Sequence, residues 1–148
     1  PGAWEVSEVR SPDGEVVQPM TERMAEVQTD AMVAKAVAAH EAGAAFIVVA
    51  WACPGDGTPE ERRDRAYIEW IDQVMRSAVR RAVDEHDVDA RYVSPGDDVC
   101  QGGITGDPTE AKRSWMADSN HVPDHESGVR MWHEWLGPLL VSEMTSDR

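Results

Sequence analysis

The chain has 148 residues, of which 41% are hydrophobic and 28% charged, and these proportions are ordinary for one soluble globular domain with a real core. The formal net charge is −14, which makes nucleic acid an unexpected partner because phosphate binding needs clustered Lys and Arg. The same charge argues against adsorption to anionic lipid, and no apolar run is long enough to insert into a membrane. We therefore expect a single domain over residues 1–148 without nucleic-acid contact or membrane insertion.

The first predicted helix begins near Glu22 and runs to about Ala42. It follows a strong turn signal over residues 11–14 (Ser-Pro-Asp-Gly), and Thr21 is a suitable N-cap for it. Gly43 is placed to end the helix as its C′ residue. The apolar stripe expected to face the core consists of Met24, Val27, Ala31, Ala34 and Val37 or Ala38.

Residues 44–51 form a short apolar run, β-branched in the middle and without alternation, which is typical of a strand buried in a parallel sheet. A long helix is predicted from Pro59 to about Glu85, with Thr58 as N-cap and Glu61 completing a capping box. A second, more exposed strand is predicted over 88–93. The apolar stripe expected on the long helix consists of Tyr67, Ile68, Ile71, Met75, Ala78, Val79, Ala82 and Val83.

The last third of the chain is predicted to hold a long loop over 94–108, a short helix or turn over 108–117 and a final helix over 127–136. That helix places Val129, Trp132 and Leu136 on one face, with Trp132 in the core. The alternation of helices and strands predicts an α/β fold with a parallel sheet. Because two strands are too few for such a sheet, at least one more is expected before Pro1, and the chain is expected to be a truncated piece.

The two cysteines, Cys53 and Cys100, both lie in predicted loops rich in Pro and Gly that follow predicted strands. Their spacing is not that of a CxxC redox motif or a zinc site. Two free thiols remain one reading. The other is a disulfide that joins two loops at the same edge of a sheet, which would indicate an oxidising compartment.

Candidate chemistry lies at Asp118-Ser119-Asn120-His121, just before the final helix. A carboxylate three residues before a histidine can fix the imidazole tautomer and stabilise its protonated form, which makes a general base for a nucleophile held elsewhere. The alternatives are a surface histidine and an aspartate that caps a turn.

No metal or organic cofactor is expected. Asp124 and His125 lie close to this pair, but Asp124 is better placed to cap the final helix than to hold a metal. Gly102-Gly103 and Gly106 lack the spacing of a dinucleotide-binding loop.

The order of these blocks resembles the C-terminal part of an SGNH hydrolase domain, of the kind fused to membrane acyltransferases that modify cell-envelope polysaccharides. The resemblance covers nearly the whole chain. It is carried by Gly2-Ala3-Trp4-Glu5, by residues 46–54, by Val99-Cys100-Gln101-Gly102-Gly103, and by Asp118 to His121 with Gly128, Trp135-Leu136 and Pro138.

The resemblance implies a three-layer α/β/α sandwich with a parallel sheet, flavodoxin-like, in which the nucleophilic serine lies in a Gly-Asp-Ser motif on the first strand. These 148 residues contain no Gly-Asp-Ser, so the nucleophile is expected upstream of Pro1 or is absent. In this reading His121 is the base and Asp118 its orienting carboxylate. Gly2 is a backbone donor to the oxyanion, although the Asn that the family uses nearby is replaced by Trp4 or lost.

Two tryptophans, Trp4 and Trp51, flank the expected C-terminal edge of the sheet, where ligands bind in open α/β folds, and are candidates for substrate binding. The resemblance also favours a Cys53–Cys100 disulfide and an extracytoplasmic domain, periplasmic or at the cell surface, tethered where the parent chain carries a membrane domain.

The expected function is that of a serine esterase or O-acyltransferase acting on acyl esters of envelope carbohydrate. Its partners would be an acylated small molecule or polysaccharide, and a membrane acyltransferase domain in the same parent chain. One alternative is a non-catalytic SGNH-like domain with a binding or structural role. Another is an unrelated flavodoxin-like module.

Overall fold

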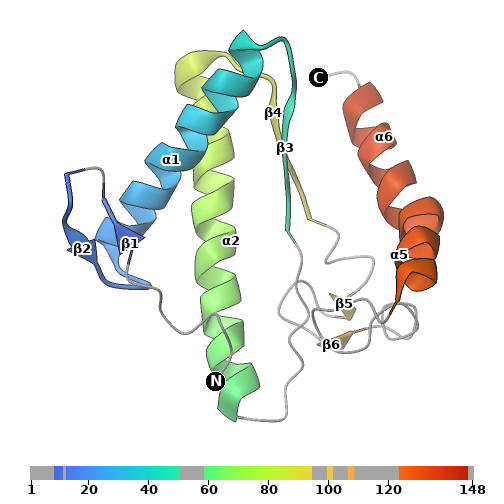
Figure 1. Cartoon of the computed structure of the whole chain (residues 1–148), viewed down its shortest axis with the longest axis horizontal. Coiled ribbons are helices and arrows are strands. Elements are labelled where there is room, and N and C mark those ends of the chain that lie inside the picture. Colours follow the sequence, from blue (N-terminus) through green and yellow to red (C-terminus); the bar gives the residue numbers. More distant parts are fainter. Residues whose placement is uncertain are drawn as a thin grey trace. The chain divides into compact units, whose positions relative to one another are not determined.

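The computed structural model describes residues 9–11, 13–50, 59–94, 100–101, 107–108 and 124–146, which form a mixed α/β chain (Figure 1). It divides into two compact units, residues 1–48 with 66–92 and residues 49–65 with 93–148, and each is described by itself. The elements in chain order are β1 (Val9–Arg10), β2 (Val16–Val17), α1 (Glu22–Glu41), β3 (Phe46–Val49), α2 (Pro59–His86), β4 (Ala90–Val93), β5 (Cys100–Gln101), β6 (Asp107–Pro108), α5 (His125–Met131), the π-helical turn η1 (Trp132–Leu136) and α6 (Gly137–Thr145).

The predicted turn at residues 11–14 joins β1 and β2 in an antiparallel hairpin, with Val9 opposite Val17. The Gly14 N–H donates to the Ser11 carbonyl at 2.8 Å, and the Ser11 N–H donates to the Glu15 carbonyl at 3.0 Å. Gly14 has φ +89°, a left-handed conformation that glycine adopts without steric cost. The hairpin therefore closes through local turn chemistry.

Both predicted ends of α1 are confirmed. The Thr21 side chain accepts a hydrogen bond from the Met24 N–H at 3.1 Å, as an N-cap does. At the other end Gly43 has φ +75°, its N–H donates to the His40 carbonyl, and the Ala44 N–H donates to the Ala39 carbonyl. This pair of bonds is the Schellman motif, which satisfies carbonyls that the helix leaves unpaired.

The buried face of α1 differs from the predicted stripe. Met24 is buried as expected, but the other buried residues are Val33 and Ala36. Ala31, Ala34 and Ala38 are exposed. An alanine-rich helix has several faces of nearly equal hydrophobicity, so packing of the bulkier Met32, Val33 and Val37 decides which face turns inward.

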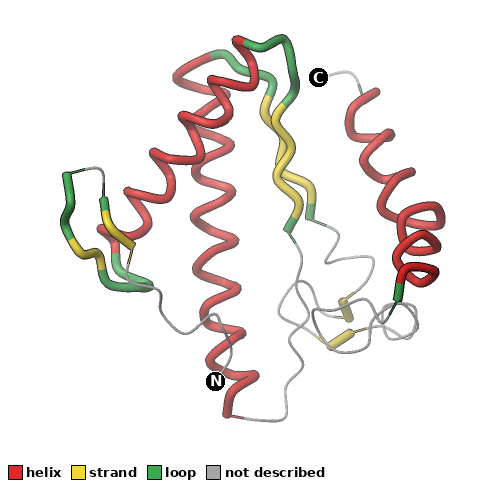
Figure 2. Tube along the Cα trace, in the orientation of Figure 1, coloured by secondary structure: helices red, strands yellow, loops and turns green. Residues whose placement is uncertain are grey.

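Strands β3 and β4 form a two-stranded sheet. The Phe46 N–H donates to the Asp89 carbonyl and the Ala50 N–H to the Val93 carbonyl, both at 2.9 Å, and this register makes the pair parallel as predicted. Helices α1 and α2 lie on the same side of the pair (Figure 2). One core cluster joins the helices to the strands. It consists of Val33 and Ala36 of α1, Val48 of β3, Ala78, Val79 and Ala82 of α2, Ala90 of β4, and Val88 just before β4.

The predicted stripe of α2 is largely confirmed in the part that packs on this sheet. Ala78, Val79 and Ala82 are buried, and Met75 and Val83 pack against them. Val74 is also buried, although the stripe omitted it. After the helix, Val88, Ala90 and Val93 are buried, so the second strand is less exposed than predicted.

The C-terminal helical stretch extends beyond its predicted bounds, from His125 to Thr145, and contains the turn η1. The Gly137 N–H donates to the Trp132 carbonyl, five residues back. Pro138 follows at once; it has no N–H, and its ring would meet the carbonyl four residues earlier in a regular helix. The expectation that Trp132 lies in the core is wrong, because it is 49% exposed, and Val129 is exposed as well.

The predicted loop over 94–108 contains a short antiparallel pair. Strand β5 pairs with β6, with Cys100 opposite Pro108 and Gln101 opposite Asp107. Strands of two residues carry no periodicity that a sequence pattern could reveal, and they depend on the pairing itself.

Candidate functional site

Six of the seven predicted site residues lie outside the described residues: Gly2, Trp4, Trp51, Cys53, Asp118 and His121. The geometry of the Asp118–His121 pair therefore stays a prediction. Thr58, the expected N-cap of α2, also lies outside, although the helix begins at Pro59 as predicted. The structure describes β3 and α2, which flank Trp51 and Cys53 in sequence, and α5, which follows His121.

Cys100 is the one predicted site residue that the structure describes. It lies in β5, is 2% exposed and takes part in a disulfide. A disulfide-bonded sulfur is neither a thiolate nucleophile nor a metal ligand. The role of Cys100 is therefore structural.

The ends of β3 and β4 define where two predicted site segments begin. The strands are parallel and end together, at Val49 and Val93, with the Ala50 N–H bonded to the Val93 carbonyl. The chain continues from this shared edge into residue 51 on one strand and into the segment before Cys100 on the other. In open α/β sheets ligands bind at the carboxyl edge of the strands.

The start of α5, which follows the Asp118–His121 pair in sequence, is described by the structure. The Asp124 carboxylate accepts a hydrogen bond from the Ser127 N–H at 2.7 Å and caps the helix, as predicted. Bonds from the Ser127 backbone and side chain hold the pKa of Asp124 below its ordinary value. This carboxylate is engaged in capping, and His121 precedes it by three positions.

A polar cluster that the sequence did not reveal joins α2 to β4. The Tyr92 hydroxyl donates to Asp72 Oδ1, and Arg76 Nε donates to Asp72 Oδ2 at 2.7 Å. The Arg76 guanidinium carbon also lies 4.3 Å from the centroid of the Tyr92 ring. The Asp72 side chain is 13% exposed, and each member of the triangle contacts both others. No sequence pattern predicts a contact between Asp72 of α2 and Tyr92 of β4, which are 20 positions apart.

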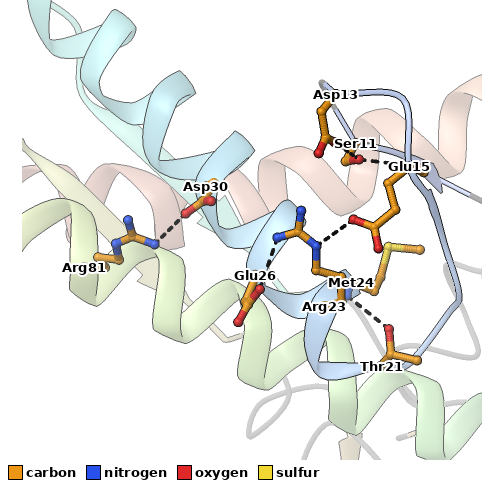
Figure 3. A network of polar contacts seen from close by, with 9 residues as sticks. All are labelled: Ser11, Asp13, Glu15, Thr21, Arg23, Met24, Glu26, Asp30 and Arg81. Atoms are coloured by element: carbon orange, nitrogen blue, oxygen red, sulfur yellow. Dashed lines mark hydrogen bonds and ion pairs between the residues drawn. The ribbon is translucent and has the colours of Figure 1, made fainter.

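A second polar network runs from the hairpin along α1 (Figure 3). Arg23 Nε bonds Glu15 at 3.0 Å and Arg23 Nη1 bonds Glu26 at 3.2 Å, while Arg81 Nη1 bonds Asp30 at 2.6 Å and so joins α2 to α1. These carboxylates raise the pKa values of Arg23 and Arg81. All of these pairs are exposed, and exposed ion pairs contribute little to stability.

The Asp30–Arg81 pair lies at an open groove between α1 and α2 of about 460 Å³. The groove is lined by Asp30, Val33, Ala34, Val37, Ala38, Glu41, Arg81 and His86. Its charged lining residues are Asp30, Glu41 and Arg81, and it holds none of the predicted catalytic residues. The lining contains no Ser, Thr, Cys or Lys that could act as a nucleophile beside His86.

Within the described ranges no three His, Cys, Asp or Glu side chains gather as a possible metal site. None of the helices in that part of the chain is long and apolar enough to cross a membrane. No protein-family model, no curated protein and no solved structure matches the chain.

Proposed function

We propose that this chain is part of an SGNH-type serine esterase or O-acyltransferase acting on acyl esters of envelope carbohydrate. His121 is the general base, and Asp118 holds its tautomer and stabilises the imidazolium. The base takes the proton of a serine hydroxyl that the wider protein supplies, and the serine oxygen attacks the ester carbonyl. The imidazolium then protonates the leaving alkoxide, and water or an acceptor hydroxyl releases the acyl group.

The observation that carries the proposal is the Asp-x-x-His block immediately before a capped helix. Asp124 caps α5 three positions after His121, so the pair comes directly before this helix in sequence. A second support is the parallel β3–β4 pair, because the segment of Trp51 and Cys53 follows β3 and the segment before Cys100 follows β4. Gly2 as oxyanion donor, and Trp4 and Trp51 as substrate contacts, belong to the same proposal.

The finer architecture is also part of the proposal. A three-layer α/β/α sandwich requires more strands beside β3 and β4 and a second helical layer on the other face of the sheet. The domain would be extracytoplasmic, next to a membrane acyltransferase domain of the parent chain. Its substrate would be an acylated polysaccharide or a small acyl ester.

The test is ester hydrolysis by the intact protein with p-nitrophenyl acetate, for the parent and for His121→Ala and Asp118→Asn. Loss of the Asp–His pair in triad enzymes lowers kcat by about 10⁴-fold, and we expect a loss of that order in both variants. His133→Ala is the matched control, because His133 is exposed on η1 and has no place in the mechanism. Full activity of His121→Ala would rule out the proposed base.

The absence of Gly-Asp-Ser from these residues and the replacement of the family's Asn near Gly2 favour one second candidate, a non-catalytic SGNH-like binding or structural domain. Labelling of the intact protein with a fluorophosphonate separates the two. An activated serine forms a covalent adduct whose yield falls in His121→Ala. A binding domain gives no adduct, and it retains acylated polysaccharide without turnover.

We further propose that the disulfide partner of Cys100 is Cys53, since these are the two cysteines of the chain. The bond would join the segment after β3 to β5. Peptide mapping under non-reducing conditions should yield one peptide pair that contains both residues. Separate thiol-containing peptides from the oxidised protein would contradict the pairing.

A further inference from the structure

The C-terminal helical stretch of α5, η1 and α6 exposes large apolar side chains. Val129 and Trp132 are 41% and 49% exposed, and Val141 and Met144 are 60% and 57% exposed. Of residues 124–146, all of which the structure describes, Gly137 alone is buried. Single exposed apolar residues are ordinary, but a contiguous group of them marks a contact surface. The arrangement of these four side chains around the helix axis is therefore decisive.

The π-helical turn η1 brings the four side chains onto one face. Val129 and Val141 are 12 positions apart in sequence, and so are Trp132 and Met144. In a regular α-helix, 12 positions place two side chains about 120° apart around the axis. The turn η1 lies between the members of each pair and takes up one extra residue, which reduces this angle to about 20–30°. We call these four residues the C-terminal apolar face.

The charged side chains of the stretch lie away from this face. Residues 124–146 contain four acidic side chains and one arginine. The same helical geometry places each of them about 90° or more from the middle of the apolar face. Arg130, for example, pairs with Glu134 at 3.9 Å, one turn further along the helix. Helices that bind a lipid surface carry several Lys or Arg on the polar face, so this composition favours a protein partner over a membrane.

The spacing of the C-terminal apolar face is symmetric about residues 136–137. Val129 is seven positions before this pair and Met144 is seven after it, while Trp132 is four before and Val141 four after. When two copies lie antiparallel about a two-fold axis at 136–137, Val129 of one copy lies level with Met144 of the other, and Trp132 with Val141. A two-fold interface requires a surface that complements itself in this way.

We infer that a second copy of this chain docks on the C-terminal apolar face and forms an antiparallel two-fold dimer. A large apolar side chain has on the order of 200 Å² of surface and these four are about half exposed, so the face offers roughly 400 Å² per copy. A standard stable interface buries about 800 Å² per partner. The dimer is therefore weak, with a dissociation constant on the order of 100 µM. The inference goes beyond the proposed esterase and holds whether or not His121 is catalytic.

The first test is sedimentation velocity of the intact protein from about 5 µM to about 1 mM, a range that brackets the expected dissociation constant. Val141→Glu and Ser142→Glu are matched variants, because they add the same charge at adjacent exposed positions. Position 141 belongs to the apolar face and position 142 does not. We expect the parent and Ser142→Glu to approach twice the monomer mass. Val141→Glu should weaken the dimer at least tenfold (roughly), because each interface would bury two carboxylates without partners.

The orientation of the copies is tested by cross-linking single-cysteine variants with a short bismaleimide, with the parent as the blank. Leu136→Cys places a thiol next to the two-fold axis, so its two copies should cross-link. In the antiparallel arrangement the two copies of position 129 are about 20 Å apart along the helices, so Val129→Cys should not cross-link.

A parent protein that stays monomeric up to about 1 mM would overturn the inference. Equal dimerisation of Val141→Glu and Ser142→Glu would also overturn it, because the contact would then lie elsewhere. Efficient cross-linking of Val129→Cys would reject the antiparallel arrangement. Binding of the monomer to phosphatidylcholine vesicles, with loss of that binding in Val141→Glu, would identify a lipid surface as the occupant and would equally reject the dimer.

Discussion

The backbone of Gly137 lies directly against Trp132. Its N–H donates to the Trp132 carbonyl across the π-helical turn, and the indole of Trp132 covers the position that a Cβ of residue 137 would occupy. That Cβ would be 2.8 Å from the Trp132 carbonyl oxygen and 3.3 Å from Trp132 Nε1. The conformation of the turn and the identity of residue 137 therefore depend on each other.

Gly137→Ala should destabilise the protein, although alanine is the better helix former. The added methyl would meet a backbone oxygen that cannot move without opening the turn, and overpacking of this kind costs about 1–3 kcal/mol. Urea unfolding followed by circular dichroism measures the change. Val141→Ala, an exposed position on α6, is the control and should change stability little. A more stable Gly137→Ala protein would show that the π turn is not required.

Ala36→Leu should destabilise the protein much more than Ala34→Leu. Ala36 is 1% exposed within the core cluster, whereas Ala34 is exposed on the same helix. A leucine at position 36 would displace packed neighbours at a cost of about 1–3 kcal/mol, while one at position 34 would extend into solvent. Thermal unfolding of the two variants gives the comparison. A larger loss of stability in Ala34→Leu than in Ala36→Leu would mean that α1 buries the predicted face, which contains Ala34.

Thr21→Ala should lower stability by about 1 kcal/mol, because the Met24 N–H loses its cap. Thr21→Ser keeps an oxygen at the same place and should recover most of the loss. Urea titrations of both variants against the parent measure the difference. Equal stability of the alanine and serine variants would show that the cap contributes nothing.

Removal of the Tyr92 hydroxyl should weaken the link between β4 and α2. In Tyr92→Phe the Asp72 carboxylate keeps Arg76 but loses one hydrogen bond, at a cost of about 0.5–1.5 kcal/mol. A double-mutant cycle with Arg76→Ala separates this bond from the contact between the guanidinium and the ring. Additive effects of the two substitutions would indicate that the triangle does not act as a unit.

The Asp124 cap should make the start of α5 sensitive to acid. Its pKa is lowered in the folded state, so the stabilisation is fully present above the unfolded value of about 3.8 and is lost as pH falls through the folded value. The Ser127 amide shift, followed by NMR between pH 2 and pH 6 (roughly this range spans both states), should report a midpoint below 3.8. Asp124→Asn keeps an acceptor without titrating and should abolish this transition. A midpoint above 3.8 would contradict the cap.

Local features of the fold could be read from the sequence because their causes are local. The turn at Gly14, the cap at Thr21, the stop at Gly43 and the cap at Asp124 each depend on residues within a few positions of each other. The parallel pairing of β3 and β4 was also predictable. The unbroken apolar run of β3 is typical of a buried parallel strand, and the long helix before β4 can serve as the crossover that parallel strands need.

Long-range packing decided the rest. The face that α1 buries and the triangle of Tyr92, Asp72 and Arg76 each depend on residues far apart in sequence. An alanine-rich helix has no single hydrophobic face, so only contact with α2 and the sheet selects one. The sequence alone was enough to predict which residues could form the Asp118–His121 pair, because they are three positions apart. The distance between a base and its nucleophile is set by tertiary structure, because the two come from distant segments.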